Sequence, residues 1–137
     1  MSLFNVFDIA GSGMSAQSTR LNTVSSNMAN SNNVSGNKDD LYRAKNPVFA
    51  TVMHDIAGRS QASGVRVVRI EESNQEATMR YEPNNPMANE MGYIYQTNVN
   101  AMEEMANMIS ASRSYQNNVE MMNTAKQLML ATLKLGE

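Results

Sequence analysis

Few side chains in this sequence are of a type and spacing that could carry out chemistry. His54 is the only histidine, so a catalytic triad or a histidine-based metal site would have to be built around it. Its setting, "TVMHDIAG", is typical of an ordinary histidine at a strand end or on the surface. The chain has no cysteine, which excludes thiolate metal sites, disulfides and cysteine nucleophiles.

Two other motifs have suggestive residues without the spacing that chemistry needs. Gly11-Ser12-Gly13 resembles the start of a phosphate-binding loop, but it lacks the third glycine and follows no strand. The carboxylate pairs Asp39-Asp40, Glu71-Glu72 and Glu103-Glu104 are adjacent in sequence, so their side chains point in different directions and cannot share a substrate. We expect all three pairs to be solvated. The sequence therefore predicts no enzyme, no cofactor and no metal site.

The charge balance narrows the classes of partner. Eleven basic and thirteen acidic residues leave a formal net charge of −2, which provides no electrostatic footprint for nucleic acid or an anionic membrane.

The start, "MSLFNVFDIAGSGM", lacks the basic region and the apolar run of a secretory signal, and no apolar stretch is long enough to span a bilayer. The length favours a single folding unit.

A repeat of seven residues at both ends of the chain predicts two long helices with coiled-coil seams. In the first helix, one row consists of Phe7, Met14, Leu21 and Met28, and the row four residues before it consists of Leu3, Ala10, Gln17 and Val24. In the second, from Asn98 onward, the rows consist of Met105, Ser112, Val119, Lys126 and Leu133, and of Met108, Tyr115, Met122 and Met129. Gly11 and Gly13 in the first helix indicate either close helix approach, or a bend, or a weakly helical start.

The segment between the helices contains short runs with partial alternation, separated by Gly, Pro and Asn: "NPVFATVM", "GVRVVRI", "ATMRYEP" and "GYIY". We expect a mainly α fold with a small β-rich insert, in which the long N- and C-terminal helices pair as an antiparallel coiled-coil-like domain. The helical domain comprises residues 1–30 and 98–137, and the insert comprises residues 31–97.

The length of the second helix predicts contacts with other chains. A helix of about 35 residues is about 50 Å long, whereas a compact globule of this size has a radius of gyration near 14 Å. The chain cannot wrap such a helix by itself. Thirteen methionines fit this interpretation, because the flexible thioether adapts to unlike neighbours, although gap-filling in a private two-helix core is the alternative.

The predicted assembly interface combines the apolar seams with three polar side chains that could fix its register, although a merely polar helix face is the alternative for these three. The interface comprises Phe7, Met14, Leu21, Met28, Met105, Met108, Arg113, Tyr115, Gln116, Asn117, Val119, Met122, Met129 and Leu133. A second class of function is a soluble coiled-coil adaptor or chaperone-like binding module.

Several segments together resemble the bacterial flagellar basal-body rod proteins, and among them the C-type proximal-rod subunits. They are "SLFNVFDIAGSGMSAQSTRLNTVSSNMANSNNVSG", "YRAKNPVF", "RYEPNNPMANEMGY" and "SASRSYQNNVEMMNTAKQLMLATLKLGE", which cover most of the chain. The family's helix-end motif, Asn-Leu-Ala-Asn, has its counterpart in residues 27–30, with Asn33 where the family has threonine.

The resemblance implies a non-enzymatic structural subunit of the proximal rod, which transmits torque and surrounds the axial export channel. The paired helices would form an inner, tube-forming domain and the insert an outer one. Implied partners in a homo- and hetero-oligomeric helical assembly are other proximal-rod subunits, the distal-rod subunit, the MS ring and the rod-capping muramidase, with neither nucleic acid nor a small-molecule substrate. The implied location is the periplasmic rod of the basal body, reached through the flagellar type III apparatus without a cleaved signal peptide.

Overall fold

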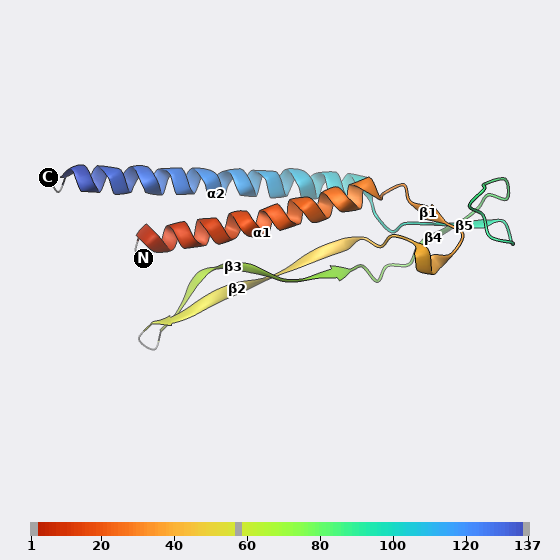
Figure 1. Cartoon of the computed structure of the whole chain (residues 1–137), viewed down its shortest axis with the longest axis horizontal. Coiled ribbons are helices and arrows are strands. Elements are labelled where there is room, and N and C mark those ends of the chain that lie inside the picture. The colour runs from red at the N-terminus through yellow and green to blue at the C-terminus, as the bar shows by residue number, and fades with distance from the viewer. Residues whose placement is uncertain (1–2, 57–58, 136–137) are drawn as a thin grey trace.

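Two long helices lie side by side and run in opposite directions along the molecule (Figure 1). The computed structural model describes residues 3–56 and 59–135. Helix α1 spans Leu3–Ala29 with 27 residues, and α2 spans Ala101–Leu135 with 35 residues. The side chain of Asn100 caps α2, since its Oδ1 accepts a hydrogen bond from the Met102 amide at 3.1 Å. In these described ranges, neither helix has an apolar stretch that could cross a bilayer.

The segment between the helices forms two antiparallel sheets. Strands β2 (Lys45–Ile56) and β3 (Arg59–Glu72) form a hairpin of 12 and 14 residues. A second sheet has the strand order β1-β5-β4 and consists of β1 (Val34–Ser35), β4 (Thr78–Tyr81) and β5 (Tyr93–Gln96). A short 3-10 helix, η1 (Lys38–Asp40), lies between β1 and β2.

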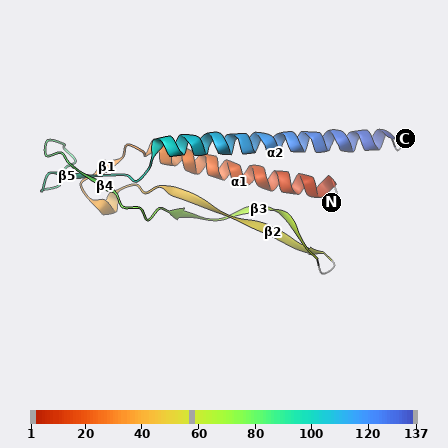
Figure 2. The same ribbon diagram turned by 180° about the vertical axis from the view of Figure 1, so that it is seen from behind.

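The expectation of a mainly α fold with a small β-rich insert is wrong. The β2–β3 hairpin lies alongside α1 over much of its length, so that the strands are a major part of the fold (Figures 1 and 2). The pairing shifts register between Val48 and Phe49 and again between Val52 and Met53. Each shift leaves one extra residue on β3, namely Val68 and Ser63, and so interrupts the alternation of side chains in that strand.

Helix α1 is the middle layer of the long part of the molecule. It contacts α2 on one side and both strands of the hairpin on the other, and both views place the hairpin away from α2. One hydrogen bond joins α1 to the hairpin at its centre, where the Val65 amide donates to Ser12 Oγ at 3.1 Å. This layering buries α1 from two sides. Among the long elements, α1 is the one with which α2 makes extensive contact.

Candidate assembly surface

The contact between α1 and α2 is built from small and polar side chains. A Cβ added at Gly13 would lie 2.9 Å from Asn118 Nδ2, and one added at Gly11 would lie 3.9 Å from Met122 Cε. The glycines therefore lie where the two helices approach closely, and both are within α1. Ala111 and Ala125, in α2, are 0% and 4% exposed. Small side chains allow this approach because little lies between the two helix backbones.

The residues at the centre of this contact form two rows with the predicted seven-residue spacing, each one position before a predicted row. In α1 the central row includes Gly13, Arg20 and Asn27, and in α2 it consists of Glu104, Ala111, Asn118 and Ala125. Arg20 Nη2 donates to Asn107 Oδ1 at 3.0 Å and adds a polar link between the helices. The predicted rows of larger side chains flank this narrow contact.

Asn27 joins α1 to the start of the hairpin. Its side chain is 0% exposed. Its Oδ1 accepts hydrogen bonds from the Lys45 amide and the Tyr42 hydroxyl, each at 2.9 Å, and its Nδ2 donates to the Lys45 carbonyl at 2.9 Å. A side-chain hydrogen bond also connects Asn27 with Glu104 of α2. One amide thus fixes both helices and β2 relative to one another.

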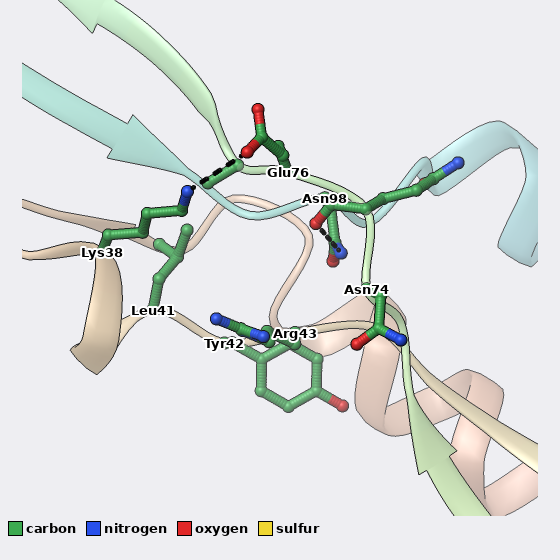
Figure 3. Close-up of a pocket in the computed structure, with 9 residues that line it drawn as sticks. Lys38, Leu41, Tyr42, Arg43, Asn74, Glu76 and Asn98 are labelled. Atoms are coloured by element: carbon green, nitrogen blue, oxygen red, sulfur yellow. Dashed lines mark hydrogen bonds and ion pairs between the residues drawn. The ribbon is translucent and has the colours of Figure 1, made fainter.

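Asn98 makes a second junction, between the approach to α2 and the connection from β3 to β4. Its Oδ1 accepts from the Ala44 amide at 2.8 Å, and its Nδ2 donates to the Gln75 carbonyl at 3.0 Å. Figure 3 shows Asn98 beside the exposed ion pair of Lys38 and Glu76, around a cavity of about 100 Å³. The cavity is part of this junction. The amide side chains and the surface ion pair that line it provide no reactive group.

Glu104 contradicts the expectation that all paired carboxylates are solvated. Its residue is only 7% exposed, and its Oε2 has no hydrogen-bond partner among the described residues. Burial raises the pKa of this carboxyl group above its ordinary value of 4.5. The hydrogen bond from Asn27 lowers the pKa, the neighbouring charge of Glu103 raises it, and the charge of Arg20 lowers it. Adjacency to Glu103 does not reveal that Asn27 and Arg20 of the other helix lie against Glu104.

We predict that Glu104→Gln removes a pH-dependent cost to stability. Because the pKa is higher in the folded chain, the folded state binds the proton more tightly, and the cost of burying the charge is present above the folded pKa. That cost disappears as the pH falls to 4.5, the ordinary value. Denaturant unfolding from pH 4 to pH 8 should therefore give a stability difference in favour of the variant, and this difference should grow with pH. A difference independent of pH would contradict this origin.

Large apolar side chains along α2 remain exposed in the described chain. Eight of its large apolar side chains are exposed, with exposed fractions from 38% for Tyr115 to 75% for Met102. They are Met102, Met105, Ile109, Tyr115, Met121, Leu128, Leu130 and Leu133. So many exposed large apolar side chains on one helix favour contact with other proteins.

The residues of the predicted assembly interface fall into two groups. Half-buried positions next to the contact between the helices are occupied by Phe7, Met14, Leu21, Met28, Met108, Val119, Met122 and Met129. Exposed positions on α2 are occupied by Met105, Arg113, Tyr115, Gln116, Asn117 and Leu133. In the part of the chain that the structure describes, Arg113, Gln116 and Asn117 have no hydrogen-bond partner, and their role as register contacts stays a prediction.

The other motifs provide no site. His54 lies in β2 opposite Gln61, outside the residues whose side chains the structure describes. Ser12, in the Gly-Ser-Gly motif, hydrogen-bonds the Ile9 carbonyl and the hairpin, so it has a packing role. Across the described ranges, no cluster of His, Cys, Asp and Glu could hold a metal ion.

Comparison with protein families places this architecture in a class. Residues 7–38 match the family model "Flagella basal body rod protein", and residues 90–135 match "Flagellar basal body rod FlgEFG protein C-terminal". These two matches include most of α1 and α2, the helices that carry the apolar rows. The class is that of the flagellar basal-body rod proteins.

Relatives of full length identify the family within this class. The chain is 47% identical to the flagellar basal-body rod protein FlgC of Salmonella typhimurium and 49% identical to that of Yersinia enterocolitica, each over 100% of both chains. It is 45% identical to FlgC of Buchnera aphidicola subsp. Acyrthosiphon pisum, again over 100% of both chains. The chain belongs to the FlgC family of flagellar basal-body rod proteins. It is a structural component of the flagellar basal body and not an enzyme, and the matches give no support to an adaptor or chaperone-like module.

Proposed function

We propose that this chain is a subunit of the proximal rod, which transmits torque and surrounds the axial export channel. The observation that carries the proposal is the set of large apolar side chains left exposed along a 35-residue helix in a chain of the FlgC family. In this proposal, residues 1–30 and 98–137 form the inner, tube-forming part, and residues 31–97 form the outer part. The layering supports it, since the hairpin covers α1 and leaves α2 free for neighbouring chains.

Packing of α2 against helices of neighbouring subunits would resist shear between them and so transmit torque. The proposed neighbours are other proximal-rod subunits, the distal-rod subunit, the MS ring and the rod-capping muramidase. The proposed place is the periplasmic rod, and the proposed route is the flagellar type III apparatus without a cleaved signal peptide. Lateral contact through the predicted interface residues, with Arg113, Gln116 and Asn117 fixing register, belongs to the same proposal.

Deletion of the gene tests the position in the rod. Cells without the chain should form the MS ring but carry no distal rod or hook, and they should not swim. Supplying the chain in trans should restore the distal rod, the hook and swimming, and the chain should then copurify with isolated basal bodies. Electron microscopy of basal bodies and swarm-plate assays measure these outcomes. Complete rods in the deletion strain would contradict a structural role, and rods that stop only beyond the proximal segment would contradict the position.

A further inference from the structure

Methionine is the side chain at which oxidation of this chain is expected to concentrate, because the sequence contains thirteen methionines but neither cysteine nor tryptophan. The exposure of each thioether controls how readily an oxidant reaches its sulfur. On helix α2, Met102 and Met105 are 75% and 46% exposed. Met108 and Met122 of the same helix are half-buried. One helix therefore carries methionines that differ in their access to oxidants.

Met102 and Met105 lie on the side of α2 that faces away from α1. Ala111 is 0% exposed and marks the side in contact with α1. Met102 precedes Ala111 by about two and a half helical turns, which places the two residues on opposite sides of the helix. Met105 and Ile109 follow Met102 at i+3 and i+7, the spacing of one helix face. In both views, α1 and the hairpin lie on one side of α2 and leave its other side uncovered by either of them (Figures 1 and 2).

Oxidation would change the chemistry of this face without a change in the backbone. Hydrogen peroxide transfers one oxygen atom to the thioether: an S–O bond forms, the O–O bond breaks, and the second oxygen leaves as water. The sulfur is thereby oxidised to a sulfoxide and the peroxide is reduced. The sulfoxide is polar, whereas the thioether is apolar. Water solvates the new group in the single chain, but a dry contact with another subunit would bury it without a hydrogen-bond partner.

We propose that Met102 and Met105 form an oxidation site, at which conversion to methionine sulfoxide blocks incorporation of the chain into the rod. The reaction precedes assembly, because a subunit that packs on this face of α2 excludes the oxidant from both sulfurs. This inference rests on the proposed function and adds to it a chemical modification that controls assembly.

Mass spectrometry of peroxide-treated samples tests the site itself. In the purified chain, we expect sulfoxide to form at Met102 and Met105 at least about threefold faster than at Met108 and Met122, which serve as controls within the same helix. In isolated basal bodies, oxidation of Met102 and Met105 should be at least about fivefold slower than in the purified chain, because the neighbouring subunit covers them.

A leucine variant tests the effect on assembly. Leucine is apolar and similar in size to methionine, but it cannot form a sulfoxide. Met102→Leu with Met105→Leu is expressed in the deletion strain with and without sublethal hydrogen peroxide, and hooks are counted by electron microscopy. Peroxide should reduce the hooks built with the original chain at least about threefold more than those built with this variant, each compared with its own untreated cells. The matched control, Met79→Leu with Met91→Leu, replaces two methionines that are 57% and 78% exposed and lie outside α2, and it should stay as sensitive as the original chain.

Three outcomes overturn the inference: equal oxidation rates of the four α2 methionines in the purified chain, equally fast oxidation of Met102 and Met105 in basal bodies, or equal peroxide sensitivity of the original chain and the leucine variant. If the double variant builds no hooks without peroxide, Met102→Leu alone is compared in the same way. Each of these outcomes leaves the rod function standing. Cells that build rods without the chain reject the rod function itself.

Discussion

Asn27→Leu is expected to lower the free energy of unfolding by about 3–5 kcal/mol, because two partly buried backbone groups of Lys45 lose their partner and each unsatisfied group costs about 1–3 kcal/mol. The Tyr42 hydroxyl loses a hydrogen bond as well. Leucine is close to asparagine in shape, so the change removes hydrogen bonds and leaves little cavity. Urea unfolding of the purified chain, followed by circular dichroism, measures the effect.

Asn22→Leu is the matched control, since Asn22 is an exposed asparagine of the same helix. A surface substitution of this kind changes stability by about 0.5 kcal/mol or less. The free energy of unfolding of a domain is only about 5–15 kcal/mol, so the Asn27 variant should lose a large part of it. Similar losses in the two variants would show that Asn27 is not the junction between α1, α2 and the hairpin.

The helices could be predicted from the sequence because their seven-residue rows are local features. The repeat indicates where α1 and α2 lie, and it gives the spacing of the contact between them. Its second row in the first helix includes Ala10 and Val24, which are 0% and 4% exposed, but it does not indicate the close approach at Gly13 or the polar link from Arg20. Close approach of two helices selects small residues and specific polar pairs, and these have no strong signal in a single sequence.

The sequence indicates strands at both arms of the hairpin, but the packing of the hairpin on α1 and the buried carboxylate could not be predicted, for a related reason. Both depend on contacts between residues far apart in the chain: β3 packs on α1, and Glu104 meets Asn27 and Arg20. The register shifts also interrupt the alternation in β3, where Val68 and Ser63 are the extra residues. The Asn, Pro and Gly residues between β4 and β5 indicate only that this segment is rich in turns.

Ile109→Asp should abolish swimming while leaving the isolated chain folded. Ile109 is 56% exposed in the single chain, so a carboxylate there is solvated and costs the fold little, about 0.5 kcal/mol for helix propensity. In a contact between subunits the same carboxylate would lose its water without gaining a partner, which costs several kcal/mol. Swarm plates measure motility, and circular dichroism of the purified variant measures folding.

Two further variants separate the loss of apolar contact from other effects of this substitution. Ile109→Met keeps an apolar side chain of similar size, so cells should still swim. Ser110→Asp places the same charge at the next exposed position of α2 without removing an apolar group, and it should reduce swimming less. Full motility with Ile109→Asp would show that this part of α2 faces water in the assembled rod. A variant that is unfolded in isolation would instead show that Ile109 stabilises the single chain, contrary to its exposure.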